Sequence, residues 1–286
     1  MSHLHVPGPI VDIDWLRANL AHPRLRVIDT RSLARAGTGT IPGARTVDTH
    51  ALQWKRSTPE AFEQFVAHAT AAIRAAGIAD GDAVVCVEEI SGAYAARAVW
   101  MLHALGHLNA ALLDGGLHGW IEAGETLALP SPAPTPSTWS PHIDPAATID
   151  GPTLRSALDD PGIIVLDTRS DPEWDAGTIP GAVHLEWTSL LGSEGHLLPP
   201  VDLRARLASI GIDAATGTVV PFCGGGYRAA HAFVVLRSLG FRAQNYAPSW
   251  NEWGAVDDFP IARPTETTAI STPRPSGKRS DAADIA

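Results

Sequence analysis

The chain has 286 residues, 45% hydrophobic and 18% charged, a balance typical of a soluble globular protein that is long enough for two domains. Its formal net charge of −10 argues against a nucleic-acid partner, because binding to a phosphate backbone depends on clustered lysines and arginines. No apolar stretch approaches the roughly 20 residues that span a bilayer, and residues 1–10 do not resemble a signal peptide, so no membrane partner is expected. Two cysteines make no disulfide framework, so a cytoplasmic location is expected.

Short β-branched runs alternate with amphipathic segments along the chain. The pattern predicts strands at residues 26–29, 83–87, 110–113, 163–167 and 217–222, and helices at 59–76 and 203–210. This alternation favours an α/β fold in which a largely parallel sheet is covered by helices. In such sheets ligands bind at the carboxyl ends of the strands.

A long internal repeat divides the chain. Val-Ile-Asp-Thr-Arg-Ser at residues 27–32 recurs as Val-Leu-Asp-Thr-Arg-Ser at 165–170, and Thr-Ile-Pro-Gly-Ala at 40–44 recurs at 178–182, with the same offset for both motifs. A period this long indicates duplicated domains, since solenoid repeats are roughly 20–50 residues. Each copy places an arginine two residues after an aspartate, which predicts a structural ion pair or a strand cap.

The segment between the copies is rich in proline. Residues 127–147 contain six prolines, which fix φ and remove backbone donors. We therefore expect a stiff, extended linker between a first domain at residues 1–126 and a second at 148–261. Residues 262–286 are rich in Thr, Ser, Pro and Ala, a composition that predicts a disordered tail.

One short loop combines several residues that could carry chemistry. The predicted strand at 217–222 is followed, in order, by Cys223, Gly224, Gly225, Gly226, Tyr227 and Arg228, and then by a helical stretch. Glycines accept positive φ and can turn amide N–H groups inward at the positive end of a helix. Such a loop favours a thiolate on its first residue, which predicts that Cys223 is a nucleophile. Arg228 would then offer a cationic fork to a substrate oxyanion, and Tyr227 a wall or a hydroxyl.

Other candidate residues have simpler interpretations. A cysteine beside a glycine-rich turn can be a small buried hydrophobe, and Cys86, surrounded by β-formers without glycines, is predicted to be one. His103 and His107 have a spacing that could hold a metal on a helix. Gly106 interrupts that helix and no further ligand is near in sequence, so we expect surface histidines and no metal site.

The sequence resembles the tandem-domain rhodaneses, a family of thiosulfate and 3-mercaptopyruvate sulfurtransferases. The resemblance rests on the paired motifs, the loop at 223–229 and Ser-Trp-Asn-Glu-Trp at 249–253. The resemblance covers residues 10–261 and implies two rhodanese-like domains, each a mostly parallel sheet flanked by helices. It also implies a catalytically silent first domain that packs beside the active second one. Aligning Gly92 with Gly226 places Glu89 at the position of Cys223, and a carboxylate cannot carry sulfur.

The resemblance further implies a two-step sulfur transfer. Cys223 would take the outer sulfur of thiosulfate, releasing sulfite and leaving a persulfide, and cyanide or a thiol, which could belong to a protein, would then remove the sulfur. The loop from Gly224 to Arg228 would bind the donor. No metal or organic cofactor is expected.

The residues that bear on the choice of sulfur donor point in two directions. The small residues at 224–226 resemble 3-mercaptopyruvate enzymes, whereas Arg228 resembles bacterial thiosulfate enzymes. Glu173 stands where mercaptopyruvate enzymes tend to carry an arginine, and it would repel the carboxylate of that donor, so thiosulfate is favoured.

Two other classes of function use a similar loop. Related cysteine phosphatases place five residues between cysteine and arginine, whereas this chain places only the four from Gly224 to Tyr227, a ring that suits a single sulfur better than a phosphoryl group. A non-enzymatic sulfur carrier needs the same loop, so the sequence leaves that alternative open.

Overall fold

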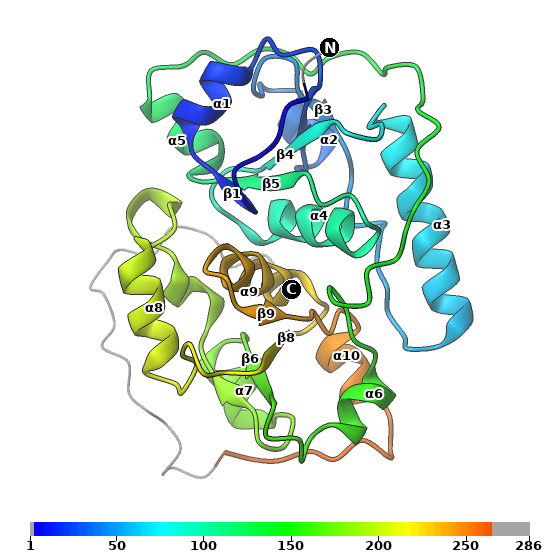
Figure 1. The fold of residues 1–286 in the computed structure, drawn as a ribbon, viewed down its shortest axis with the longest axis vertical. Coiled ribbons are helices and arrows are strands. Elements are labelled where there is room, and N and C mark those ends of the chain that lie inside the picture. The colour runs from blue at the N-terminus through cyan, green and yellow to red at the C-terminus, as the bar shows by residue number, and fades with distance from the viewer. Residues whose placement is uncertain (1–2, 265–286) are drawn as a thin grey trace.

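Two parallel β-sheets form the centre of the structure, a computed structural model that describes residues 3–264 (Figure 1). The strand order of the first sheet is β1–β5–β4–β2–β3 and that of the second is β7–β6–β8–β9, with every neighbouring pair parallel. The strands are β1 (Ile10–Val11), β2 (Leu25–Asp29), β3 (Arg45–Thr46), β4 (Ala83–Val87), β5 (Ala110–Leu113), β6 (Ile163–Asp167), β7 (Val183–His184), β8 (Thr218–Phe222) and β9 (Arg242–Ala243).

The predicted α/β fold with two parallel sheets is thereby confirmed. The five predicted strands correspond to β2, β4, β5, β6 and β8, each to within one residue. The remaining four strands have two residues each, which is too short for a periodic pattern to appear in the sequence.

Helices cover both faces of each sheet. In the first unit, α3 (Pro59–Ala75) and α4 (Ala93–Ala104) pack on one face, and α1 (Ile13–Asn19) and α5 (Gly116–Glu122) on the other. In the second unit, α8 (Pro200–Ala208) and α9 (Tyr227–Ser238) share one face, and α6 (Gly151–Ser156), α7 (Asp171–Ala176) and α10 (Ser249–Trp253) lie on the other. The short helices α2 (Leu33–Ala36), η1 (Trp187–Leu190) and η2 (Ser193–Gly195) lie in the connections.

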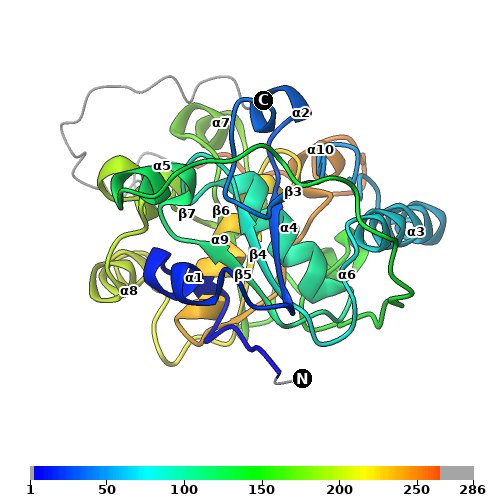
Figure 2. The same cartoon turned by 90° about the horizontal axis from the view of Figure 1, so that it is seen from above.

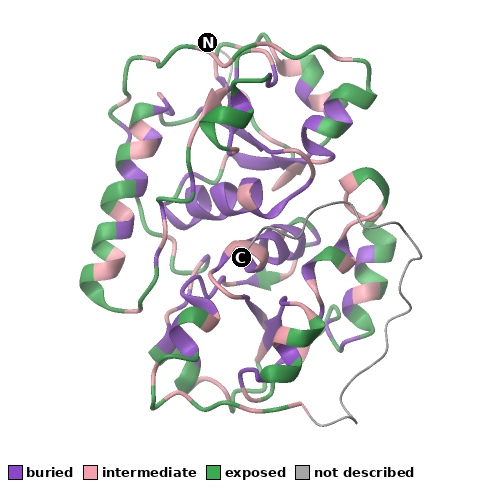
Figure 3. Cartoon of the chain, turned by 180° about the vertical axis from the view of Figure 1, so that it is seen from behind, coloured by how far each residue is buried: buried purple, intermediate pink, exposed green. Residues whose placement is uncertain are grey.

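The two units meet through α4 and α9, which lie face to face at the middle of the molecule (Figure 1). Seen from above, both helices lie at the centre, with α3 and α8 at opposite sides (Figure 2). Helices α4 and α9 each pack on their own sheet and on one another, so both are buried along most of their length (Figure 3). One hydrophobic cluster therefore contains residues of both units, among them Trp100 of α4 and Phe233 of α9.

The repeated Asp-Thr-Arg-Ser motif forms the same ion pair in both units. Arg31 Nη2 lies 2.7 Å from Asp29 Oδ2, and Arg169 Nη2 lies 2.6 Å from Asp167 Oδ2. In each unit the same guanidinium nitrogen also donates to the carbonyl of a downstream glycine, at 2.6 Å in both cases. The predicted structural ion pair is confirmed. In each unit it fixes the conformation of the segment that follows the strand, β2 in the first unit and β6 in the second.

The segment at 127–147 runs in extended form across the top of the first unit and then down past α3 (Figure 1). The Ser137 N–H donates to the Arg74 carbonyl at 2.9 Å, and the Arg74 guanidinium donates to the Trp139 carbonyl at 2.7 Å. Ala262 and Thr178 exchange two backbone hydrogen bonds of 2.8 and 2.9 Å, so the fold includes the residue at which the predicted tail begins. The rest of that predicted tail, from 265 onward, lies outside the described residues. Within residues 3–264, none of the helices has the length and apolar character needed to cross a membrane.

Candidate active site

Cys223 lies directly after β8 and before α9, at the carboxyl end of a central strand. Its side chain is buried, and its Sγ accepts a hydrogen bond from the Gly226 N–H at 3.0 Å. Gly226 is the N-cap of α9, with a φ of 86°, and a Cβ at this position would lie 2.4 Å from the Ala247 carbonyl oxygen. Only glycine therefore fits there, and the sulfur lies at the positive end of a 12-residue helix.

The left-handed backbone expected of this loop is confined to Gly226. Gly224 and Gly225 are absent from the glycines with positive φ in the described chain. A Cβ added to Gly224 would lie 3.2 Å from an Arg228 nitrogen, and one added to Gly225 would lie 3.3 Å from the Asn251 amide nitrogen. Gly224 and Gly225 therefore matter because they have no side chain, which leaves room for the side chains of Arg228 and Asn251.

Helix α10 holds the loop in place. The Trp250 N–H donates to the Cys223 carbonyl and the Asn251 N–H donates to the Gly224 carbonyl, both at 2.9 Å. The Ser249 hydroxyl accepts the Cys223 N–H at 3.1 Å, and Ser249 itself has a left-handed φ of 57°. The Ser-Trp-Asn-Glu-Trp motif thus satisfies three backbone groups of the loop, a role that its sequence does not indicate.

Arg228, which the sequence predicts to offer a cationic fork to a substrate, is paired with a carboxylate of the protein. Its Nη1 and Nη2 donate to the two carboxylate oxygens of Glu173 in α7, at 2.6 and 2.8 Å. Burial alone would raise the pKa of Glu173, but its hydrogen bonds with Arg228 and Ser170 lower that pKa to about 2. Burial likewise opposes the charge of Arg228, yet Glu173 and the Cys223 sulfur together raise its pKa. Glu173 therefore compensates the charge of Arg228, a role that its interpretation as a repelling charge misses.

The first unit contributes side chains to the surroundings of the loop. Gln53 Nε2 donates to the Tyr227 hydroxyl at 3.0 Å, and the Tyr94 ring meets the Tyr227 ring edge-on, with centroids 5.1 Å apart. Above the same ring lies the guanidinium of Arg97 in α4, with Cζ 4.4 Å from the centroid. Tyr227 therefore faces the first unit, and the loop lies at the junction of the two units.

Glu88 occupies in the first unit the position that Cys223 has in the second. Strand pairing aligns Asp29 with Val87 and Asp167 with Phe222, so the residues that follow β4 and β8 are Glu88 and Cys223. The alignment that placed Glu89 there is wrong by one residue, because the loop before α4 is one residue longer than the loop before α9.

The carboxylate of Glu88 fills the loop of the first unit. It accepts the Tyr94 and Ala95 N–H groups at the start of α4, at 2.8 and 3.2 Å. Burial raises its pKa to about 7, in spite of these hydrogen bonds. Glu89 instead turns toward Arg35, at 3.2 Å. The chemical conclusion is unchanged, since a carboxylate again replaces the thiol.

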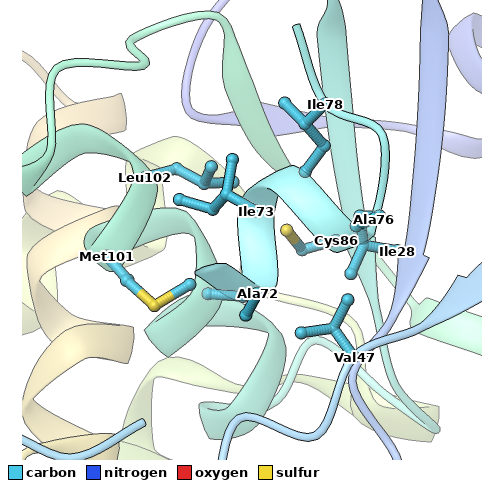
Figure 4. Close-up of a pocket in the computed structure, with 10 residues that line it drawn as sticks. Ile28, Val47, Ala72, Ile73, Ala76, Ile78, Cys86, Met101 and Leu102 are labelled. Atoms are coloured by element: carbon cyan, nitrogen blue, oxygen red, sulfur yellow. The ribbon is translucent and has the colours of Figure 1, made fainter. Parts of the chain in front are cut away.

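Cys86 is a core residue, as predicted. It is fully buried in β4, and burial raises the pKa of its thiol. It borders a closely packed apolar cavity of about 10 Å³ in the first unit, together with Ile28, Ile73 and Met101 (Figure 4). That volume is about the space of a single water molecule, so the cavity is no substrate site.

The histidine pair is not on the surface, contrary to the prediction. His103 and His107 are both buried, and each ring Nε2 lies 2.9 Å from a backbone carbonyl oxygen, that of Ala110 and that of Asp82. Burial lowers the pKa of both, to about 4 for His103. Gly106, with a φ of 89°, turns the chain between them. Among residues 3–264, there is no group of three or more His, Cys, Asp or Glu side chains that could hold a metal.

Comparison with known proteins agrees with this geometry. The family model of the rhodanese-like domain matches residues 12–123 and again residues 152–256. The chain belongs to the rhodanese family.

Several relatives match this rhodanese over most of their length. A thiosulfate sulfurtransferase of Pseudomonas aeruginosa is 30% identical, over 88% of this chain and 96% of its own. A probable 3-mercaptopyruvate sulfurtransferase of the same organism is 32% identical, over 86% and 95%. The solved structure of SseA from Escherichia coli, described as a 3-mercaptopyruvate sulfotransferase, superposes with a TM-score of 0.73 at 25% identity, over 85% of this chain and 99% of its own. Family membership supports the sulfurtransferase class and leaves the sulfur donor open.

Proposed function

We propose that the protein is a sulfurtransferase that moves the sulfane sulfur of thiosulfate to a thiophilic acceptor through a persulfide on Cys223. The observation that carries the proposal is the position of the Cys223 sulfur, which is buried at the start of α9 and accepts the Gly226 N–H at 3.0 Å. The same N–H and the helix terminus favour negative charge on whatever sulfur the loop holds.

The reaction has two displacements at sulfur. The Cys223 sulfur attacks the outer sulfur of thiosulfate, the sulfur–sulfur bond to the sulfonate group breaks, and its electron pair leaves with sulfite. An acceptor such as cyanide or a thiol then attacks the outer sulfur of the persulfide and regenerates the Cys223 thiolate. Because each displacement exchanges one sulfur bond for another, no redox cofactor is needed, and ping-pong kinetics are expected.

We assign this chemistry to the second domain alone. Glu88, at the position equivalent to Cys223, has no nucleophilic sulfur, and the N–H groups at the start of α4 are already bound to its carboxylate. The four-residue spacing between Cys223 and Arg228 also supports sulfur over phosphoryl transfer, because the turn of three glycines is short and closely packed against α10.

Thiosulfate is the proposed donor and 3-mercaptopyruvate the alternative. Cys223 is buried in a closely packed loop, which supports thiosulfate, the smaller of the two donors. The relatives named above include both kinds of enzyme, so the donor must be decided by measurement.

The test compares both donors on one preparation. We expect turnover of thiosulfate with cyanide, loss of activity in Cys223→Ala, and retention of activity in Cys86→Ala, the matched control at the other cysteine. Turnover of neither donor would overturn the enzyme assignment. A kcat/KM more than ~10-fold higher for 3-mercaptopyruvate would overturn the donor assignment. Persulfide formation on Cys223 without small-molecule turnover would identify a sulfur carrier instead.

A further inference from the structure

Arg97 is a buried cation that has no carboxylate partner within the described part of the chain. It projects from α4 of the first domain, is 1% exposed, and donates from Nη2 to the Leu52 carbonyl at 2.8 Å. Its Nη1 is buried and has no hydrogen-bond acceptor among the residues that the structure describes. Burying a guanidinium and leaving one of its nitrogens unpaired is costly, and the contacts that offset this cost are one backbone hydrogen bond and the rings of Trp100 and Tyr227.

The other arginines near the active loop differ from Arg97 in this respect. Arg169 is bound to Asp167 and Arg228 to Glu173, each through a bidentate pair. In residues 3–264, no ion pair involves Arg97. Of the three arginines compared, Arg97 is therefore the one whose charge has no carboxylate partner among the described residues.

Arg97 also lies close to the reactive loop. Its guanidinium covers the ring of Tyr227, the residue that follows the glycines, with Cζ 4.4 Å from the ring centroid. Burial lowers the pKa of Arg97, while negative charge on Tyr227 or on Cys223 acts in the opposite direction. Tyr227 follows Cys223 in the same loop, four residues on, so the contact with its ring places the guanidinium beside the reactive loop.

We propose that Arg97, contributed by the first domain, is the cation that serves the site, and that its uncompensated charge attracts the oxyanion of the sulfur donor toward Cys223. This inference deepens the proposed function and rests on Cys223 as the reactive group. It assigns a role in substrate binding to the domain that lacks the nucleophile. It also transfers to Arg97 the oxyanion-binding role that the sequence assigns to Arg228, because Glu173 already compensates Arg228.

The test measures whether the site prefers an anion, independently of sulfur transfer. Iodoacetate and iodoacetamide both alkylate a thiolate with release of iodide, and they differ in that iodoacetate carries a negative charge. The readout is the ratio of their second-order rate constants at Cys223, measured by mass spectrometry. A change in folding or in access affects both reagents, so it cancels in the ratio.

We expect Arg97→Met, which keeps length and removes charge, to lower the iodoacetate-to-iodoacetamide ratio about tenfold, or ~1.4 kcal/mol. Arg97→Lys should restore most of the ratio. Arg237→Met is the matched control, because Arg237 also projects from an interface helix and covers an aromatic ring, that of Phe233, with Cζ 5.1 Å from the centroid. It should leave the ratio within about twofold.

Two outcomes separate this proposal from the proposed function. An unchanged ratio in Arg97→Met, or a larger loss in Arg228→Met, would overturn the assignment of Arg97 while leaving Cys223 as the nucleophile. If Cys223 of the wild-type protein reacts with neither reagent and forms no persulfide with thiosulfate, the proposed function fails. For the sulfurtransferase reaction itself, the Arg97→Met variant should show a raised KM for thiosulfate, with Arg97→Lys intermediate.

Discussion

At the scale of single residues, the active loop depends on which charges are compensated. Arg228 adjoins the Cys223 sulfur, but Glu173 binds both of its terminal nitrogens. Arg97, from the other domain, has no such partner among the described residues. The attraction between a buried arginine and an anionic substrate depends on how much of the arginine's charge is left unpaired by carboxylates. The arginine nearest to Cys223 therefore need not be the one that attracts the substrate most strongly.

The pair of Glu173 and Arg228 predicts a loss of stability in acid. The pKa of Glu173 is lowered from 4.5 to about 2 in the folded protein, so its stabilising effect is present above about pH 4.5 and is lost as the pH falls toward 2. Glu173→Gln should therefore be less stable than the wild type at pH 7, and the difference should disappear near pH 2. Urea unfolding across this range measures it, with the exposed Glu60→Gln as control. A difference that did not change with pH would contradict the prediction.

At the scale of elements, each of the two strand–loop–helix units presents backbone amides at the start of its helix to a different side chain. In the second unit the loop amide of Gly226 meets the Cys223 sulfur, and in the first unit the amides of Tyr94 and Ala95 meet the Glu88 carboxylate. The duplicated element keeps an anion-binding helix terminus even where the residue that fills it has no nucleophilic sulfur.

The buried Glu88 predicts the opposite pH dependence. Its pKa is about 7 in the folded protein and near 4.5 in the unfolded chain, so the unfolded chain releases its proton first as the pH rises. The wild type should lose stability between about pH 4.5 and 7, by up to about 3 kcal/mol. In Glu88→Gln this loss should be absent, while the Gln oxygen still accepts both amides. Thermal unfolding at pH 4.5 and pH 8 checks the prediction, and parallel curves for the two proteins would refute it.

At the scale of the whole molecule, the domains are joined by a shared core. One hydrophobic cluster includes Trp100 of α4 and Phe233 of α9, and further contacts cross between the units, such as those of Ser57 with Glu252. The loop that carries Cys223 leads directly into α9, one of these two interface helices. The first domain is therefore positioned to affect the active site directly.

This shared core predicts cooperative unfolding. Phe233 is fully buried at the interface, so Phe233→Ala should cost about 3–4 kcal/mol and lower the midpoint of a single transition for both domains. Calorimetry provides the measurement, and Leu129→Ala, at a side chain 74% exposed, is the control expected to change little. Two separate transitions, with only one shifted, would show that the domains unfold independently.

Some of these features follow from local sequence alone. The strands β4, β6 and β8 have β-branched runs long enough to be recognised, and the offset of the repeated motifs reveals the duplication. Cys223 is recognisable in the sequence because a predicted strand precedes it and three glycines and a helical stretch follow it. These features are local, so neighbouring residues specify them without reference to the rest of the fold.

Other features depend on residues that are distant in the sequence, and only the tertiary structure decides them. The pairing of Arg228 with Glu173 joins positions 55 residues apart, and the stacking of Arg97 on Tyr227 joins the two domains. The burial of His103 and His107 likewise depends on helix packing and on carbonyl groups of neighbouring strands. The sequence by itself therefore determined the family, the duplicated α/β fold and the candidate nucleophile, because periodicity and ordered motifs are written along the chain. Which arginine of the described residues has a carboxylate partner was decided by packing, because charge compensation is a property of neighbours in space.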